Sequence, residues 1–372
     1  MTDERIHIIH VLSTLDPGGM EGGVVNIVNG IDPEKFKVSI CCLESSGILE
    51  QKIQKDKRRI FVMNKKPGRA WFLPFRLKKL FREQNAHIVH THNYSTLIYG
   101  ALGSLFPGGP RLVHGEHGDL PLQINNSWYM FVRKLLCSGA AGFHTVSKSL
   151  KHMLEKYVGI PSGKIRHIPN GLDLKRFMPH DRLLLRKEAG FSEEEFILVA
   201  IGSFYPWKNQ KLVIETASGL RKRGLNFIML LIGEGPLEKE LKTMVKEKDL
   251  ENHVRFPGYM NNIEDYLNLS DVLIQPSLTE GMANTIMEAM ACGIPVLASD
   301  VGGNPELVRH GETGYLFPVD NMDMLLDQIN DLYEQREERA LMGENARRIA
   351  EQEYEIRDMI KQYEQLYESS TG

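Results

Sequence analysis

Two glutamates in the second half of the chain stand where carboxylates could bind a ligand. Glu280 lies in a loop, and Glu288 follows eight positions later within an apolar helical pattern. The apolar positions around it are spaced as one buried helix face: Ile286, Met287, Ala289 and Met290. A carboxylate there is costly to bury unless it is hydrogen-bonded, and the hydroxyls of a ribose or hexose would do that. Backbone N–H groups before the helix could hold a phosphate. The segment therefore predicts sites for a sugar, a ribose and a phosphate.

One lysine and a glycine-rich loop follow other predicted strands. Lys208 comes where a compact positive charge could meet a diphosphate, although an exposed surface lysine is the alternative. Gly18, Gly19 and Gly22 follow the first predicted strand and open a helix at about 23–29. Their backbone could approach an anion closely, but a tight packing turn would use the same residues. The Gly-x-Gly-x-x-Gly pattern is absent, so an NAD site is a poor fit.

Histidines end two predicted strands of the first half. His90 and His92 point to the same side of one strand, and His114 and His117 lie at the end of the next. No cysteine or carboxylate stands nearby at ligand spacing, so we expect no metal site. We expect instead a histidine that binds a hydroxyl, with a histidine that only caps the strand end as the alternative. The sequence also has no Asp-x-Asp pair, so phosphate binding is expected to be metal-free.

Short apolar strands alternate with amphipathic helices through the whole chain. Strands are predicted at 6–12, 37–43, 59–63, 88–92, 111–115, 142–146, 196–202, 226–233, 254–257, 272–275 and 295–299. This alternation predicts an α/β fold with two doubly wound domains. We place the first at 1–173 and the second at 174–353, with a hinge at 168–173, and expect a C-terminal helix at about 354–372 to pack back on the first. The ligand would lie between the carboxyl ends of the two sheets.

Composition restricts the class of protein. A length of 372 residues, 42% hydrophobic and 25% charged, is typical of a soluble globular protein with two domains. The net charge of −3 argues against a nucleic-acid partner. The four cysteines form no CxxC pair, which indicates a reducing, cytosolic setting. A signal-peptide pattern and an apolar run of the ~20 residues that span a bilayer are both lacking. We therefore expect a cytoplasmic protein, with any membrane contact being peripheral, at the inner face.

Residues 52–82 could supply that contact. They hold twelve Lys or Arg and one acidic residue. They also carry the aromatic residues Trp71, Phe72, Phe75 and Phe81. Cationic and aromatic side chains together suit an anionic membrane surface. The leucines at 73, 77 and 80 are spaced for packing on a sheet, so a solvated helix face is the alternative.

The segment from Glu280 to Glu288 closely resembles the EX7E signature of retaining glycosyltransferases of the GT-B fold, the group 1 type. Further segments resemble the same family in the same order: the glycine loop 18–23, the interdomain segment 167–173 with Phe177, the strand 271–277 and the loop 299–306. The resemblance spans essentially the whole chain. It implies two Rossmann-like domains that face each other across a deep cleft, with a nucleotide-sugar donor held mainly by the C-terminal domain.

The resemblance also implies roles for the candidate residues of the donor site. Glu288 would bind the ribose hydroxyls, Glu280 the hydroxyls of the transferred sugar, and Lys208 the diphosphate. The other donor-binding positions would be Gly281, Met282, Ala283, Asn284, Ser203, Gly18, Gly19 and Gly22. Many relatives carry an arginine at the position of Ser203, so Lys208 is expected to be the cation at the diphosphate here.

On the acceptor side, the resemblance implies a histidine that contacts the sugar near its reacting carbon. His117 is the preferred candidate, because it comes just past the strand where the family's histidine stands, and His114 is the runner-up. His92, His114 and Asn93 are the candidates for contact with the acceptor.

The expected reaction is transfer of a hexosyl group, with retention at the anomeric carbon, from a nucleotide-diphosphate sugar that we expect to be UDP-linked. The acceptor would be a saccharide or lipid-linked hydroxyl in cell-surface polysaccharide or glycolipid synthesis. The family implies no cofactor and no metal. Two alternatives stay open: a nucleotide-sugar epimerase of the same fold, which needs no acceptor, and a non-catalytic partner subunit, which would bind no nucleoside diphosphate.

Overall fold

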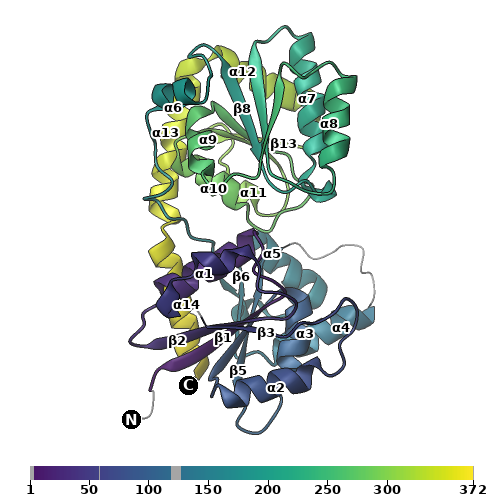
Figure 1. Cartoon of the computed structure of the whole chain (residues 1–372), viewed down its shortest axis with the longest axis vertical. Coiled ribbons are helices and arrows are strands. Elements are labelled where there is room, and N and C mark those ends of the chain that lie inside the picture. Colours follow the sequence, from purple (N-terminus) through teal and green to yellow (C-terminus); the bar gives the residue numbers. More distant parts are fainter. Residues whose placement is uncertain (1–3, 58, 119–126, 372) are drawn as a thin grey trace. The chain divides into compact units, whose positions relative to one another are not determined.

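The structure is a computed structural model that describes residues 4–57, 59–118 and 127–371. The chain divides into two compact units (Figure 1). The first comprises Met1–Gly171 together with Ile356–Gly372, and the second comprises Leu172–Glu355. The division assigned from the sequence differs from this one by two residues at each crossing.

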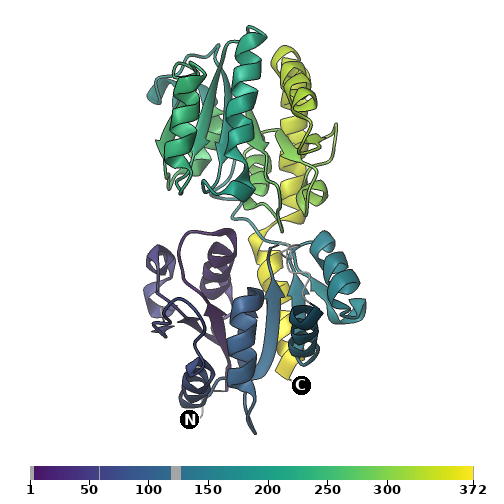
Figure 2. The same cartoon turned by 90° about the vertical axis from the view of Figure 1, so that its right-hand side faces the viewer.

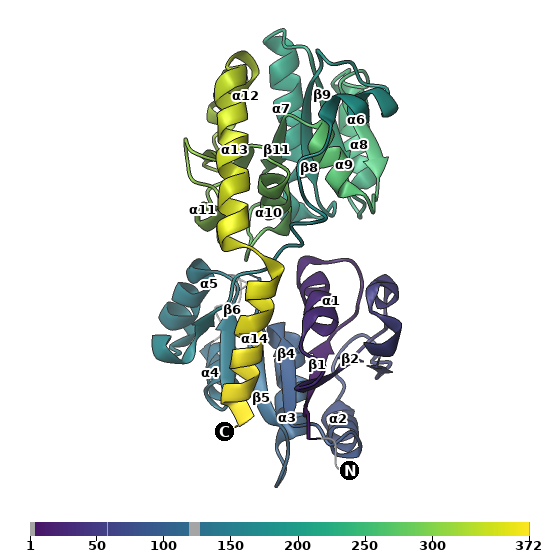
Figure 3. The same ribbon diagram turned by 90° about the vertical axis from the view of Figure 1, so that its left-hand side faces the viewer.

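The first unit is built on a parallel sheet with the strand order β3-β2-β1-β4-β5-β6-β7. Its strands are β1 Ile6–Leu12, β2 Phe36–Cys42, β3 Ile60–Val62, β4 Ile88–His92, β5 Arg111–Glu116, β6 Gly142–Thr145 and β7 Arg166–His167. Its α-helices are α1 Gly19–Gly30, α2 Leu73–Glu83, α3 Asn93–Ser104, α4 Ser127–Ser138, α5 Lys148–Met153 and α14 Ile356–Thr371. Helices α1 and α14 cover one face of the sheet, and α2 to α5 cover the other (Figures 1 and 3).

The second unit repeats this architecture with the strand order β10-β9-β8-β11-β12-β13, again all parallel (Figure 2). Its strands are β8 Phe196–Ile201, β9 Phe227–Ile232, β10 Val254–Gly258, β11 Val272–Gln275, β12 Val296–Ser299 and β13 Gly314–Phe317. Its α-helices are α6 Arg182–Glu188, α7 Gln210–Lys222, α8 Glu238–Glu247, α9 Ile263–Leu269, α10 Asn284–Ala291, α11 Asn304–Leu307, α12 Met322–Glu334 and α13 Arg336–Glu353. Helices α9, α10 and α13 pack on one face, and α7, α8 and α12 on the other.

The doubly wound α/β class predicted from the sequence is confirmed. The central strands are buried on both faces, as parallel strands must be, and β8 and β9 therefore read as continuous apolar runs. Two helix starts differ from the expectation: α1 begins at Gly19 instead of 23, and α14 begins at Ile356 because Tyr354 ends α13. The short strands β7 and β13 were not foreseen. Among the described residues, no helix is both long and apolar enough to span a bilayer.

Candidate functional site

The candidate site of the second unit lies where the strand order of its sheet reverses, between β8 and β11. Ligands of open α/β sheets bind beyond the carboxyl ends of the strands at such a point. Lys208 comes from the 3-10 turn Pro206–Lys208 after β8, and Glu280 comes from the loop after β11. Lys208 Nζ lies 2.6 Å from Glu280 Oε1. Two residues that are 72 positions apart thus form a half-buried ion pair.

The Glu280 carboxylate is held by two further donors. Gln275 Nε2 lies 2.8 Å from Glu280 Oε1, and Ser277 Oγ lies 2.7 Å from the same oxygen. Gln275 in turn accepts a hydrogen bond of 3.0 Å from Thr285 Oγ1, in the first turn of α10. Gln275 and Ser277 are buried. Because one oxygen accepts from three donors, the position of this carboxylate is fixed and its charge is partly compensated.

Close backbone contacts shape the loop that carries Glu280. Gly302 has a φ of +53°, and a Cβ there would lie 1.8 Å from the carbonyl oxygen of Glu280. The same oxygen accepts a hydrogen bond of 3.2 Å from the N–H of Gly303. On the other side, Asn209 has a φ of +55° and donates from Nδ2 to the Pro276 carbonyl at 3.2 Å. The loops after β8, β11 and β12 are therefore tied into one surface, and only glycine fits at position 302.

Helix α10 presents the second glutamate. The expected apolar face is confirmed, since Ile286, Met287, Ala289 and Met290 are fully buried. Glu288 is half-buried, which spares it the full cost of desolvation. The pKa of Arg176 is raised chiefly by the 2.7 Å hydrogen bond that Arg176 donates to Glu264, and the charge of Glu288 contributes to the same rise. Glu288 therefore lies near a cation that the sequence analysis did not single out.

The remaining donor-site candidates of this unit lie around these two carboxylates. Ala283 is the N-cap of α10 and contributes no capping side chain, so an anion there could complement the first turn of the helix. Gly281 and Ala283 are buried, and Met282 and Asn284 are half-buried. Ser203 is exposed in the loop after β8, and its carbonyl accepts a hydrogen bond of 2.9 Å from Gln210 Nε2.

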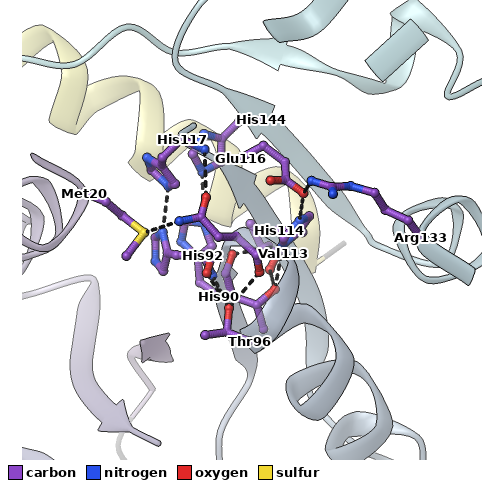
Figure 4. A network of polar contacts seen from close by, with 12 residues as sticks. Met20, His90, His92, Thr96, Val113, His114, Glu116, His117, Arg133 and His144 are labelled. Atoms are coloured by element: carbon purple, nitrogen blue, oxygen red, sulfur yellow. Dashed lines mark hydrogen bonds and ion pairs between the residues drawn. The ribbon is translucent and has the colours of Figure 1, made fainter. Parts of the chain in front are cut away.

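In the first unit, candidate residues converge at the corresponding reversal of strand order, between β1 and β4. Asn93 has a φ of +64° and links two elements: its Nδ2 lies 3.2 Å from the sulfur of Met20 in α1, and its Oδ1 accepts from the N–H of His117 at 3.2 Å (Figure 4). His117 Nε2 lies 2.9 Å from His92 Nδ1. The first turn of α1, the start of α3 after β4 and the end of β5 therefore meet in one group of residues.

Two of the predicted acceptor-side residues face inward. His92 is buried and contacts His10 through Nε2 (2.9 Å) and His117 through Nδ1. His114 is also buried, with Nδ1 2.8 Å from Thr91 Oγ1 and Nε2 2.9 Å from Glu116 Oε1. Both rings thus use both nitrogens within the unit, so neither ring is placed for direct contact with an acceptor. Of the four histidines at the strand ends, only His117 keeps part of its surface exposed.

Behind His114 lies a buried ion pair that the sequence analysis missed. Arg133 of α4 bonds to Glu116 Oε1 (Figure 4). Its guanidinium lies 5.1 Å from the ring centre of Tyr94. Burial alone would raise the pKa of Glu116, but the charge of Arg133 and the hydrogen bond from His114 hold it below its usual value. A carboxylate that is so engaged orients β5 and α4 and is not available as a base.

The glycine loop is largely the first turns of α1. Gly18 is the N-cap, and a Cβ there would lie 2.2 Å from Glu21 Oε2, so a carboxylate of the protein already lies against the start of this helix. Burial raises the pKa of Glu21. This arrangement weighs against a phosphate at Gly18 and Gly19. A Cβ at Gly22 would meet no atom within 4 Å, so the backbone there is open to a ligand.

Among the described residues, one cluster could hold a metal ion. Ring nitrogens of His10, His90 and His92, all buried, lie within 4.8 Å of one another. The expectation that no metal binds was based on missing cysteine and carboxylate partners, and it did not consider a site made only of histidines from different strands. In the structure these nitrogens contact one another and Tyr367 directly.

Two family models match the chain, one in each unit. The model described as Glycosyltransferase Family 4 matches residues 17–176, and the one described as Glycosyl transferases group 1 matches residues 181–349. HepE from Anabaena, solved in complex with UDP and glucose, superposes on the chain with a TM-score of 0.85, covering 98% of this chain and 100% of HepE at 22% identity. The chain belongs to the GT-B glycosyltransferases.

Two curated relatives extend the comparison. An Escherichia coli protein named UDP-Gal:alpha-D-GlcNAc-diphosphoundecaprenol alpha-1,3-galactosyltransferase is 27% identical to this glycosyltransferase, over 98% of this chain and 97% of that protein. A Bacillus anthracis protein named N-acetyl-alpha-D-glucosaminyl L-malate synthase is 32% identical over 56% of this chain and 54% of its own length. The names of these two relatives thus contain a diphosphoundecaprenol-linked sugar and L-malate.

Proposed function

We propose that this glycosyltransferase moves a hexosyl group from a UDP-sugar to a hydroxyl of a lipid-linked saccharide, with retention at the anomeric carbon and without a metal ion. The contact between Lys208 and Glu280, at the reversal point of the second sheet, is the observation that carries the proposal. It joins a group suited to a leaving diphosphate to a group suited to sugar hydroxyls. The E. coli relative, similar over nearly its full length, supports the UDP donor and the lipid-linked acceptor.

In this proposal, Lys208 and the start of α10 hold the diphosphate. Negative charge grows on the leaving diphosphate as the glycosidic bond breaks, so a fixed cation and helix N–H groups stabilise the transition state more than the ground state. The absence of an Asp-x-Asp pair supports a site in which Lys208, not a divalent metal, supplies the positive charge.

Glu280 and Glu288 would bind hydroxyls. Glu280 Oε1 already accepts from Lys208, Gln275 and Ser277, which leaves Oε2 as the oxygen suited to a hydroxyl of the transferred sugar. Glu288 is half-buried in α10, the helix that follows this loop, and it suits the ribose. Both carboxylates would orient the donor, which lowers the entropic cost of reaching the reactive geometry.

Retention would follow from attack on the face that the diphosphate leaves. A double displacement needs a carboxylate free to attack the anomeric carbon, whereas Glu280 is engaged by three donors. The acceptor hydroxyl would instead attack while the C–O bond to the diphosphate breaks, and its proton would pass to the departing phosphate oxygen. His117 would contact the sugar from the first unit.

A transfer assay tests the proposal. The chain is incubated with UDP-sugars and a diphospholipid-linked GlcNAc, and the anomeric configuration of the product is read by NMR. The proposal expects an α-linked product from an α-linked UDP-hexose, in the presence of EDTA. Inverted product would contradict retention, loss of activity with EDTA would contradict the metal-free site, and sugar conversion without acceptor would indicate an epimerase.

Contact with an anionic membrane would bring the enzyme to such an acceptor. On α2 and the residues before it, Trp71, Phe72 and Phe75 expose 70% or more of their surface. The side chains buried against the sheet are Leu73, Leu77, Leu80 and Phe81. The sequence predicted Phe81 to be part of the basic, aromatic surface, and this prediction is wrong. The exposed cations of the same helix are Arg76, Lys79 and Arg82. Helix α2 therefore both packs on the sheet and presents a basic, aromatic surface.

Vesicle sedimentation tests this contact. Reversing Arg76, Lys79 and Arg82 to Glu should weaken binding to vesicles that contain phosphatidylglycerol by at least tenfold, because each cation near such a surface contributes about 1 kcal/mol. Phosphatidylcholine vesicles should bind neither protein. Reversal of three exposed lysines of the second unit, Lys187, Lys222 and Lys239, is the control. Equal sedimentation of both triple variants with anionic vesicles would discard the contact.

A further inference from the structure

A continuous line of side chains runs through the first unit behind His117. His117 Nε2 lies 2.9 Å from His92 Nδ1, and His92 Nε2 lies 2.9 Å from His10 Nδ1. His10 Nε2 is 3.4 Å from the hydroxyl of Tyr367 in α14. That hydroxyl is 2.9 Å from His90 Nδ1. We call these residues, together with His144, the histidine chain.

The line ends at His144. His90 Nε2 lies 3.0 Å from His144 Nε2, and His144 Nδ1 has no hydrogen-bond partner among the residues that the structure describes. His10, His90, His92 and His144 are buried, whereas His117 is only half-buried. The histidine chain therefore has one enclosed end, at His144, and one end at the candidate site, at His117.

Gly115 makes room for the two ends to approach each other. A Cβ at Gly115 would lie 2.3 Å from His144 Nε2 and 3.0 Å from His117 Nε2. Only a residue without a side chain fits there, although every other residue of its strand, β5, carries a side chain of the size of valine or larger. The packing of the sheet thus accommodates the histidine chain specifically.

The rings of the chain are neutral. Burial lowers the pKa of His10 to about 3 and that of His117 to about 4. Burial and neighbouring histidines lower the pKa of His90, His92 and His144 well below the ordinary value. Burial raises the pKa of Tyr367, so its hydroxyl keeps its proton. Each ring therefore has one proton to donate and one lone pair to accept with, and the Tyr367 hydroxyl has one proton to donate and an oxygen that accepts.

Each of the five contacts needs one proton. If His10 and His90 both donated to the Tyr367 oxygen, the buried Tyr367 hydroxyl proton would have no partner in the line, which is costly. When Tyr367 also donates within the line, neutral members can supply the protons in two ways only. All protons point from His117 toward His144, or all point from His144 toward His117. The first order buries an N–H at His144 Nδ1 without a partner, while the second leaves an unprotonated nitrogen there. Buried N–H groups without a partner are rarer and costlier than unused acceptors, so the second order is favoured.

We infer that the histidine chain fixes His117 as its Nδ1–H tautomer, so that His117 meets the substrate as a hydrogen-bond donor and not as a base. His92, His10 and Tyr367 are then positioning residues, because they act through His117. The inference rests on the proposed function for the contact between His117 and the transferred sugar. A donor at this place would bind a sugar hydroxyl or an oxygen of the leaving group while the acceptor proton leaves by the diphosphate.

Long-range ¹H–¹⁵N spectra of the full chain with labelled histidine test the tautomer without any substrate. The expected spectrum shows His117 protonated at Nδ1, with its signal identified by its loss in His117→Asn. Tyr367→Phe removes the only hydroxyl of the histidine chain and should give a mixture of His117 tautomers. Tyr363→Phe removes a hydroxyl from the same buried face of α14, outside the chain, and should leave the spectrum unchanged. A His117 ring protonated at Nε2, or one unaffected by Tyr367→Phe, would overturn the inference.

Turnover tests the donor role. Asn places an N–H near the position of Nδ1 and Gln near that of Nε2, so His117→Asn should keep more activity than His117→Gln. Tyr367→Phe should lower kcat by about tenfold with little change in KM, and Tyr363→Phe should not. Equal activity of the two His117 variants would overturn the donor role. Absence of transfer by the unaltered chain would overturn the proposed function instead, while the spectra would still decide the tautomer.

Added ZnCl₂ separates the histidine chain from a metal site. The shared protons between His10 and His92 leave no lone pair for a metal, so the spectrum should not change at one equivalent of zinc. Loss of the His10 and His92 proton signals with stoichiometric zinc binding would overturn the proton order and assign the cluster to a metal.

Discussion

At the scale of single residues, the two candidate sites differ in their chemistry. Around Glu280 a charge is shared among three donors, so the site of the second unit is polar and partly open. Around His117 neutral rings share protons within a buried core, so the group of the first unit is rigid and uncharged. One site suits a charged diphosphate, and the other suits a neutral sugar.

The buried histidines predict an acid sensitivity confined to the first unit. Their pKa is lowered on folding, to about 3 for His10 and about 4 for His7 and His117, so the unfolded chain takes up protons first as pH falls. Their contribution to stability is present above pH 6.5 and is lost as pH falls toward 4. From pH 7.5 to 5, we expect up to roughly 2 kcal/mol lost for each such histidine.

Hydrogen exchange measured by mass spectrometry checks this prediction, unit by unit. Peptides of β1 and β4 should lose protection at pH 5 relative to pH 7.5 after correction for intrinsic exchange. The second unit is the internal control, because none of its described histidines is buried. Equal loss in both units, or none in the first, would contradict the prediction.

Residue types were easier to predict than their contacts. The sequence indicates Glu280, Lys208 and the histidines at strand ends, because each follows an apolar run. It does not indicate that Lys208 reaches Glu280, since this contact spans 72 positions and depends on the strand order. Gln275 and Ser277 were missed as partners of Glu280 because they lie within an ordinary strand end. His10 was missed because His7 and His10, three positions apart in an apolar strand, form no pattern that indicates a site.

At the scale of elements, parallel strands gather side chains at one edge of each sheet. Candidate residues follow β1, β4 and β5 in the first unit and β8 and β11 in the second, next to the points where the strand order reverses. Strand positions were predicted within about two residues where an apolar run was long. The strands β7 and β13 were missed because they are short and lie at sheet edges.

The glycines of α1 give a prediction at this scale. Glycine in a helix costs about 1 kcal/mol relative to alanine, so a run of glycines is typical of a loop and does not indicate a helix that begins at Gly19. A Cβ at Gly22 or Gly23 would meet no atom within 4 Å, so Gly22→Ala and Gly23→Ala should each raise the free energy of unfolding by about 0.5–1 kcal/mol.

Only the first of these variants should impair transfer, because the ligand contact was assigned to Gly22. Urea unfolding and initial rates on the two variants check this outcome, with Gly23→Ala as the matched control. If both variants were stabilised and both kept full transfer activity, the assignment of a ligand contact to Gly22 would be wrong.

At the scale of the whole molecule, the chain crosses between the units twice. The C-terminal helix α14 returns to the first unit, where Met359, Tyr363, Leu366 and Tyr367 are buried against the sheet. Tyr367 also completes the histidine chain. Helix α14 therefore contributes to the core of the unit that also contains β1.

Removal of α14 should unfold the first unit alone. Burial of each large apolar side chain contributes about 1.5–3 kcal/mol, so their sum rivals the 5–15 kcal/mol that typically stabilises a domain. A chain that ends at Glu355 should lose exchange protection in β1 and β4 and keep it in β8 and β11. A chain that ends at Ser370 is the control. Undiminished protection in β1 after truncation at Glu355 would contradict the prediction.

The central claim is that the second unit binds a nucleoside diphosphate through Lys208, and calorimetric titration with UDP and UMP tests it most directly. We predict that Lys208→Met weakens UDP binding at least tenfold, which is about 1.4 kcal/mol, and leaves UMP binding unchanged, since only UDP carries the second phosphate. Lys211→Met, which alters an exposed lysine three positions along the chain, should bind UDP like the unaltered chain. Equal affinity for UDP in the Lys208→Met variant and the unaltered chain would contradict the account.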